Sequence, residues 1–220
     1  MYCKLAMESY CRAEEYYKEI SEANFSMEKS DEETEFSKQV VSTVVFSAMC
    51  LESFFNNYLA ACLGDKNFYE TYDNLSPVSK LCLITDLLFR IKIDKSKSYY
   101  AGVKNLFYLR NRYVHNKSKH AASYGFYTEE EIAVIEELRN APDNIPGDIP
   151  HLNKKEIQKD LKDAYESLKA VRDVAKFFDE NDANCFAMVQ LFGAYNYSFA
   201  SAYEQRYMKE VFAKLGIKKA

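Results

Sequence analysis

The chain has 220 residues, 48% of them hydrophobic, and a formal net charge of −4, which fits one globular domain with a sizeable core. The acidic balance excludes a protein that coats itself with nucleic acid, and the scarcity of Gly and Pro, six and four residues, disfavours a turn-rich β fold. The six Cys include no CxxC pair, so no disulfide framework or Cys-based metal site is indicated and a reducing cytosol fits best.

Neither a targeting segment nor a membrane span is predicted. The first 15 residues carry charges and lack the apolar stretch of a signal peptide. The longest apolar run, Val40–Leu51, is interrupted by hydroxyl residues and is shorter than a bilayer requires. We therefore expect a soluble cytoplasmic protein with no membrane partner.

The first two predicted elements are helices. Aromatic and charged residues recur with helical spacing over residues 3–23. After a linker, Ser30-Asp31-Glu32-Glu33 is a capping box that opens a long helix. We expect this helix to run to about Leu63 and to stop at Gly64, a natural left-handed C-terminal residue.

Two further helices lead into the centre of the chain. Ser76-Pro77 predicts a helix start, with Ser76 as N-cap and Pro77 in the first helical position, and this helix should extend to about Ile91. The next helix begins near Ser98. The positions expected to face the core are Leu81, Ile84, Leu87 and Leu88 in the first, and Val103, Leu106, Phe107 and Leu109 in the second.

The remaining elements are also helical. A capping box at Thr128 opens a short acidic helix to about residue 140, and residues 141–151 form a proline-stiffened connection. A long amphipathic helix follows from Asn153 to about Glu180, with Ile157, Leu161, Tyr165, Leu168, Val171 and Ala175 inward. A last aromatic-rich helix covers about residues 184–214 and ends at Gly216.

No strand pattern of any strength accompanies these helices. The sequence therefore predicts an all-α, up-and-down helical bundle forming a single domain over residues 1–220. We expect its core to span about residues 35–180, with additional helical extensions at residues 1–30 and 181–220.

Charge is distributed unevenly along the chain. Residues 90–120 contain nine Lys or Arg and one acid, Asp94, so this segment carries +8 and the remainder −12. Such a basic island in an acidic protein is typical of a site for an anion such as a phosphate backbone. For the lysines of residues 92–97 alone, a solvated loop is an equally good interpretation.

The segment Lys104–Lys119, KNLFYLRNRYVHNKSK, places Arg110, Asn111 and His115 at the end of a helix. Histidine titrates near neutral pH and can take the proton of an RNA 2′-hydroxyl or protonate the leaving oxygen. Arginine presents a fixed fork of donors that matches phosphate oxygens, and Asn111 can position either group. The histidines at 115, 120 and 151 lack metal-ligand spacing, so no metal or other cofactor is expected.

Helix geometry restricts how these residues can meet. Asn111 and His115 are four residues apart and lie about 40° from one another, whereas Arg110 and His115 are about 140° apart. Either the helix loosens near Val114, or Arg110 and His115 meet through a second subunit. This spacing is a reason to expect a homodimer.

Glu52 interrupts an apolar face of the second helix, because it follows Ala48 and precedes Asn56 at helical spacing. A carboxylate on such a face requires a cation or several donors. One interpretation is a structural ion pair with an arginine. The sharper one is that this arginine is Arg110 and that Glu52 orients it.

The hexapeptide Arg110–His115 resembles the R-N-x-x-x-H signature of the HEPN superfamily of all-α bundles. The long helix carrying LESFFN, the SPVSKLCLI helix before the motif and the amphipathic helix after it agree in order, so the resemblance covers about residues 35–180. It implies a metal-independent endoribonuclease, often a toxin of a two-gene module or a component of phage defence. It also implies that the motif histidine and arginine act near a dimer axis, where two copies form one cleft.

Two functions follow from these observations. The first is a HEPN-type endoribonuclease that uses Arg110, Asn111 and His115 on RNA, acts as a homodimer and is controlled by a cognate antitoxin or inhibitor protein. The second is a catalytically silent HEPN-like module that binds RNA, a nucleotide or a protein. In both, the basic residues expected to hold the RNA are Lys104, Arg112, Lys117 and Lys119.

Overall fold

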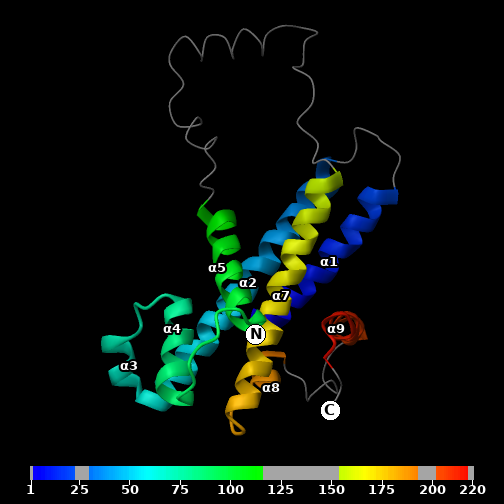
Figure 1. Cartoon of the computed structure of the whole chain (residues 1–220). Helices are drawn as coiled ribbons and strands as arrows, with labels where there is room; N and C mark the ends of the chain where they lie inside the picture. Colours follow the sequence, from blue (N-terminus) through cyan, green and yellow to red (C-terminus); the bar gives the residue numbers. More distant parts are fainter. Residues whose placement is uncertain (1, 23–29, 116–153, 193–201, 218–220) are drawn as a thin grey trace, which may run out of the picture.

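The computed structural model describes residues 2–22, 30–115, 154–192 and 202–217 (Figure 1). Within these ranges the chain forms helices, turns and connecting segments and no strand, which confirms the all-α prediction. The acidic helix expected over residues 128–140 and the proline-rich connection after it lie outside the described residues, as do Lys117 and Lys119.

Four helices form the centre of the bundle: α1 (Tyr2–Glu22), α2 (Ser30–Leu63), α5 (Ser98–His115) and α7 (Lys154–Asn181). Figure 1 shows α1 and α7 running beside α2, and α5 packs against both α7 and α2. The buried stripe of α2 recurs at helical spacing and comprises Phe36, Val40, Val44, Leu51, Phe55 and Leu59. All four helices contribute to one cluster of buried residues.

Aromatic rings fill the part of this core that lies beside the C-terminal end of α7. Phe178 of α7 contacts Phe54, Tyr58 and Phe89, with ring centroids 4.8, 5.1 and 5.2 Å away and edge-to-face geometry. The hydroxyl of Tyr58 donates to Asp182 Oδ2 at 2.7 Å, which satisfies its polar end. In a chain without Trp, these rings supply the volume of the core.

Helix α1 belongs to the core and is not an extension outside it. Cys3, Ala6, Met7 and Ala13 are at most 1% exposed and pack in the same cluster as the buried residues of α2. The core therefore reaches well before residue 35, where the sequence placed its start. Lys214 of α9 (Ala202–Leu215) pairs with Glu14, so the last helix also contacts α1.

The turn after α2 follows the sequence prediction, and the element after it was missed. Gly64 ends α2 with a φ of 82° and a ψ of 139°, a positive-φ conformation that favours glycine. A short helix, α3 (Asp65–Thr71), then forms in a stretch for which no element was predicted. Its Phe68 is fully buried, which attaches this corner to the bundle.

The next helix starts as predicted and ends differently. The Ser76 side chain accepts a hydrogen bond from Ser79 N at 3.1 Å, and Pro77 occupies the first position of α4 (Pro77–Leu83). The helix then widens into a π-helical turn, η2 (Ile84–Phe89), and ends at Arg90 with a φ of 55°. This turn rotates Leu87 outward to 49% exposure, so the prediction that Leu87 faces the core is wrong.

Lys80 of α4 is a buried cation that the sequence pattern did not indicate. It is 1% exposed, and its Nζ donates to Asn56 Oδ1 and to the carbonyl of Asp73, both at 2.7 Å. The ammonium also lies 5.6 Å from the centroid of the Phe68 ring. Lys80 thereby ties α2, α3 and α4 together.

Two described helices fall within the range of about residues 184–214 that was predicted as one last helix. α8 (Ala187–Phe192) and α9 are separate in the described residues, and residues 193–201 between them lie outside the description. Gly216 ends α9 with a φ of 62°, as the sequence indicated. Arg172 Nη1 donates to the carbonyl of Leu215 at 2.6 Å, which joins the end of α9 to α7.

Among the described helices, Glu32–Leu63 is long and apolar enough to cross a membrane, with a mean hydropathy of 1.2. Half of that window is buried inside the protein. Length and composition of this kind also characterise the core helix of a soluble protein, so this is weak evidence of a span and the cytoplasmic location stays a prediction.

Candidate functional site

The motif lies on α5, which α7 holds closely. Gly102 of α5 faces Ala170, and a Cβ added at Gly102 would lie 3.0 Å from the Ala170 Cβ. Val103, Leu106 and Leu109 of the same helix are buried. The helix is thus fixed along its inner side, and its other side is free to carry functional groups.

The outer face of α5 carries the polar residues. Lys104, Tyr108 and Asn111 are exposed and recur at spacings of four and three residues, which places them on one side of the helix. α5 contains no Asp or Glu. This face is therefore free of acidic side chains from its own helix.

Arg110 turns toward this face although its Cα does not. Its Nη1 donates a hydrogen bond to Asn111 Oδ1 at 3.0 Å. Asn111 and His115 share a helix face, so this bond draws the guanidinium toward the side on which His115 is placed. The His115 side chain lies outside the described residues.

The backbone of α5 remains α-helical to His115. The loosening near Val114, one of the two ways in which Arg110 and His115 were expected to meet, is therefore not found in the described backbone. The long arginine side chain bridges part of the angle instead. A meeting of the two groups through a second subunit stays a prediction.

Arg112 contributes to packing between α5 and α7. Its Nη2 lies 3.0 Å from Asp163 Oδ2 and 4.0 Å from Asp160 Oδ1. The Tyr113 hydroxyl donates to Asp160 Oδ1 at 3.0 Å, and the guanidinium lies over the Tyr113 ring. Arg112 was predicted to bind RNA, but two carboxylates of α7 already neutralise it.

Burial shifts the pKa values of two members of this cluster, Asp160 and Tyr113. It raises the pKa of Asp160 above its usual range, against the hydrogen bond from Tyr113 and the nearby Lys159 and Arg112. Burial, together with the Asp160 charge, also raises the pKa of Tyr113. The cluster therefore holds a carboxyl group, Asp160, whose pKa is raised and which is ionised less readily than in water.

Glu52 does not form the predicted pair. Within the described part of the chain, no ion pair or hydrogen bond joins Glu52 to Arg110, and the Glu52 side chain is half-buried. The most buried stripe of α2 passes through Leu51 and Phe55, so Glu52 lies beside it and keeps access to water. Asn56, the next position on the Glu52 face, is the residue that meets a cation, Lys80.

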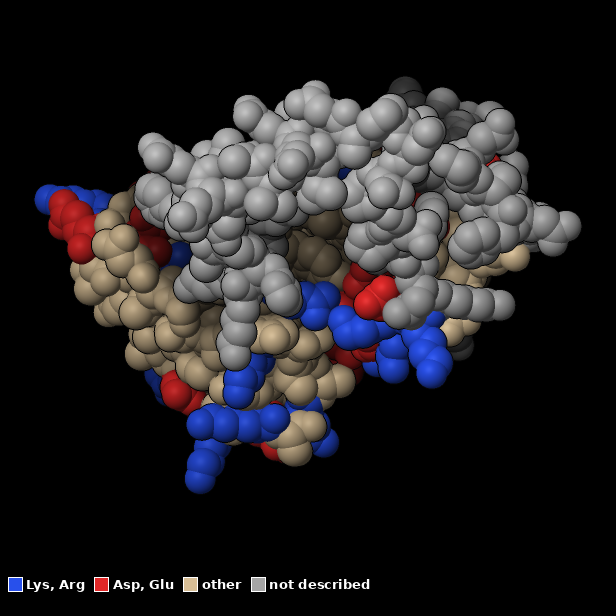
Figure 2. All heavy atoms as spheres, turned by 90° about the horizontal axis from the view of Figure 1, so that it is seen from above, with Lys and Arg blue, Asp and Glu red and all other residues tan. Residues whose placement is uncertain are grey.

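The described basic residues of the segment 90–115 are spread out and do not form one patch. Lys92, Lys95 and Lys97 precede α5, and the motif lies toward its other end, from about 18 Å (Arg110) to about 26 Å (His115) along the axis from Ser98. On the face seen in Figure 2, part of which is covered by residues that the structure does not describe, Lys and Arg are interspersed with Asp and Glu. Among the residues that the structure describes, an anion site near the motif therefore depends on local groups of α5 and not on the summed charge of the segment.

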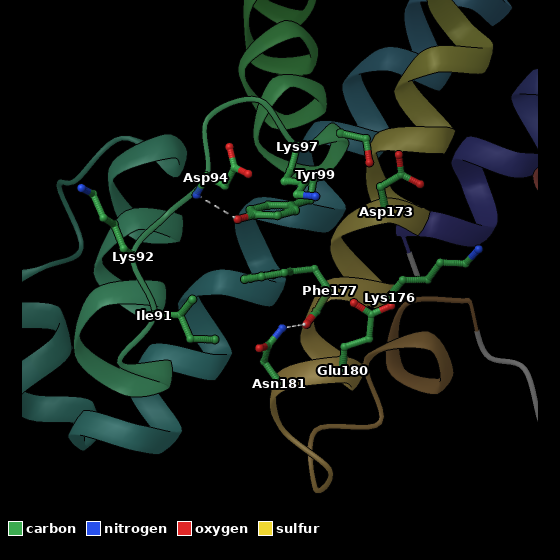
Figure 3. A pocket seen from close by; sticks show the side chains of 11 residues that line it. Ile91, Lys92, Asp94, Lys97, Tyr99, Asp173, Lys176, Phe177, Glu180 and Asn181 are labelled. Atoms are coloured by element: carbon green, nitrogen blue, oxygen red, sulfur yellow. Dashed lines mark hydrogen bonds between the residues drawn. The ribbon is translucent and has the colours of Figure 1, made fainter.

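A cavity of about 420 Å³ opens at the start of α5, between residues 91–99 and α7. Its floor is the stacked pair Tyr99 and Phe177, whose ring centroids are 3.9 Å apart (Figure 3). Lys92 and Lys176 extend away from these rings in opposite directions in Figure 3. The lining contains three lysines and three carboxylates, Lys92, Lys97, Lys176, Asp94, Asp173 and Glu180, so its charge does not favour an anion.

Potential metal ligands do not converge in the described residues. No group of three or more His, Cys, Asp or Glu there has the placement needed to hold a metal ion. The site on α5 consists instead of an arginine, an asparagine, a lysine and an exposed tyrosine. These are groups that bind anions and flat rings.

Comparisons with models of protein families, with curated proteins and with solved structures give no match.

Proposed function

We propose that this protein is a metal-independent endoribonuclease of HEPN type, acting as a toxin or in phage defence. The observation that carries the proposal is the hydrogen bond from Arg110 to Asn111, because it holds a guanidinium beside the face of α5 to which His115 belongs. Phosphate chemistry without a metal needs these two kinds of group.

The reaction assigns one task to each group. His115 takes the proton of an RNA 2′-hydroxyl, and the 2′-oxygen then forms a bond to the adjacent phosphorus. The bond from phosphorus to the 5′-oxygen breaks, which leaves a 2′,3′-cyclic phosphate, and the leaving oxygen receives a proton. Arg110 stabilises the additional negative charge on the phosphorane with its fork of donors.

Asn111 is the orienting residue in this scheme. A free arginine side chain samples many rotamers, and fixing it costs free energy that would otherwise weaken catalysis. The hydrogen bond from Arg110 Nη1 to Asn111 Oδ1 restricts these rotamers before RNA binds. The other guanidinium donors remain available for phosphate.

A homodimer completes the proposal. Each chain supplies one His115, whereas the reaction needs a base for the 2′-hydroxyl and an acid for the leaving oxygen. Two copies meeting near His115 would provide both. A cognate antitoxin or inhibitor protein that covers the same face would switch the activity off.

The second candidate is a catalytically silent module that binds RNA, a nucleotide or a protein on the same face. It is favoured by the exposure of Lys104, Tyr108 and Asn111 on a helix without acidic residues, which suits binding even without chemistry. It differs from the first candidate in needing no function for His115.

Cleavage of total RNA in EDTA separates the two. We expect the wild type and His120→Ala to cleave, and His115→Ala to leave the RNA intact. His120→Ala is the matched control, because it removes the same side chain five residues away. If the wild type cuts nothing, or if His115→Ala cuts as fast as the control, the nuclease is ruled out.

The oligomeric state is tested by light scattering at micromolar concentration. The composite site requires a mass twice that of the 25.5 kDa chain. A monomer with full cleavage activity would remove the second subunit from the mechanism.

A further inference from the structure

Tyr108 is the most exposed of the large hydrophobic residues that the structure describes. It is 64% exposed, although its neighbours Phe107 and Leu109 are 8% and 3% exposed. In the described residues no hydrogen bond or ring contact joins Tyr108 to another side chain. The ring therefore contributes little to the fold, and most of its surface is open to solvent.

Its position relates it to the candidate site. Lys104, Tyr108, Asn111 and His115 follow one another at spacings of four, three and four residues, so their Cα atoms lie within about 60° of one helix face. Along the axis, Tyr108 is about 4.5 Å from Asn111, and Lys104 is about 6 Å further away. An aromatic ring thus lies between an exposed cation and the Arg110–Asn111 pair.

The charge of this face suits a polyanion that carries flat rings. Lys104 is exposed and α5 has no carboxylate, so a phosphate near Tyr108 meets no repulsion from this helix. Aromatic side chains stack on nucleic-acid bases irrespective of sequence, because every base has a π-face. The base then contacts Tyr108 and the phosphate contacts Lys104, about one helical turn away.

We propose that Tyr108 is a base-stacking residue that makes the site select unpaired RNA. A base next to the phosphate held by Arg110 stacks on the Tyr108 ring, and Lys104 binds the phosphate beyond it. In a duplex the bases are stacked on one another and cannot offer a face to the ring. This inference rests on the proposed function and adds a substrate class, RNA loops and single-stranded ends.

Binding of RNA to full-length protein in a His115→Ala background tests the proposal without cleavage. The probes are a fluorescein-labelled unpaired oligonucleotide of about 12 nucleotides and the same strand annealed to its complement, measured by fluorescence anisotropy at constant salt. We expect Tyr108→Ala to weaken binding of the unpaired strand about tenfold or more and to leave duplex binding unchanged. Tyr108→Phe keeps the ring and should bind as the parent does.

Tyr69→Ala is the matched control, since Tyr69 is 58% exposed on α3 and is not part of the α5 face. It should bind both probes as the parent does. Circular dichroism and light scattering on each variant show that fold and mass are retained.

Three results would overturn the proposal: no binding of the unpaired strand by the parent, equal losses for the two probes, or dissociation of a dimer by Tyr108→Ala. The last would mean that a second copy covers the ring. Cleavage by the wild type is read separately. Selective binding without any cleavage would keep the stacking role and remove the nuclease.

Discussion

Arg112 and Asp163 join α5 to α7 through a contact of 3.0 Å between Nη2 and Oδ2. Arg110, two residues earlier, bonds to its neighbour Asn111 on the same helix. The two arginines of one hexapeptide therefore have different tasks. Arg112 attaches α5 to α7, whereas Arg110 lies near the outer face of α5 and uses Nη1 for its bond to Asn111.

This division predicts opposite effects for the same substitution. Arg112→Gln should lower the free energy of unfolding by about 1 kcal/mol, because it removes a partly exposed ion pair, and should leave the cleavage mechanism in place. Arg110→Gln should leave stability unchanged and abolish cleavage. Urea denaturation and RNA cleavage by both variants check this. If the Arg112→Gln protein is as stable as the wild type but no longer cleaves RNA, Arg112 takes part in the site and does not act only in packing.

Arg110→Lys tests the fork of donors. Lysine keeps the positive charge but cannot donate to Asn111 and to phosphate in the same planar arrangement. We expect RNA binding in the His115→Ala background to change little, and single-turnover cleavage in the wild-type background to fall about 10²-fold. Equal cleavage by arginine and lysine would show that charge alone is sufficient.

Lys80 provides a test of the fold far from the site. Lys80→Ala leaves Asn56 Oδ1 and the Asp73 carbonyl without their donor and opens a cavity, so we expect a loss of about 3 kcal/mol. Lys80→Met retains most of the volume and should lose less. Urea denaturation measures both. Identical losses would mean that the cavity contributes nothing and that the lost hydrogen bonds of the ammonium account for the whole effect.

Gly102 tests the close contact between α5 and α7. Gly102→Val introduces atoms into the space taken by Ala170 and should destabilise the protein by about 2 kcal/mol. Ala101→Val places the same β-branched side chain on the exposed side of the same turn and is the control. Thermal unfolding of the pair separates overpacking from helix propensity. A Gly102→Val protein as stable as the control would show that the helices can separate at no cost.

Asp160 predicts a pH dependence. Burial raises its folded pKa above the unfolded value, so the folded state binds the proton more readily. Its contribution to stability is then fully present below the unfolded pKa, about 3.9, and is lost as pH rises through the folded pKa. An asparagine side chain cannot titrate, so Asp160→Asn should gain stability relative to the wild type between about pH 3 and pH 7. Urea denaturation at both values checks the sign, and a difference independent of pH would contradict it.

Much of the fold could be predicted from local signals. The ends of α2 and α9 at Gly64 and Gly216, and the cap at Ser76, follow from backbone conformations that one or two residues favour. The π-helical turn at Ile84–Phe89 was not predictable, because no residue in it signals a wider helix and the turn depends on packing against the core. The same holds for α3, whose single buried ring, Phe68, finds its place only once α2 and α4 are adjacent.

The sequence by itself determined the helical class and the face of α5 on which Lys104, Tyr108, Asn111 and His115 are placed. These depend on spacing within one helix, which the 3.6-residue repeat sets. Only the tertiary structure decided that Arg112 is paired, that Glu52 is not paired with Arg110 in the described residues, and that Lys80 is buried. A side chain's partner across the bundle depends on which helices pack together and at what rotation, and no local spacing contains that information.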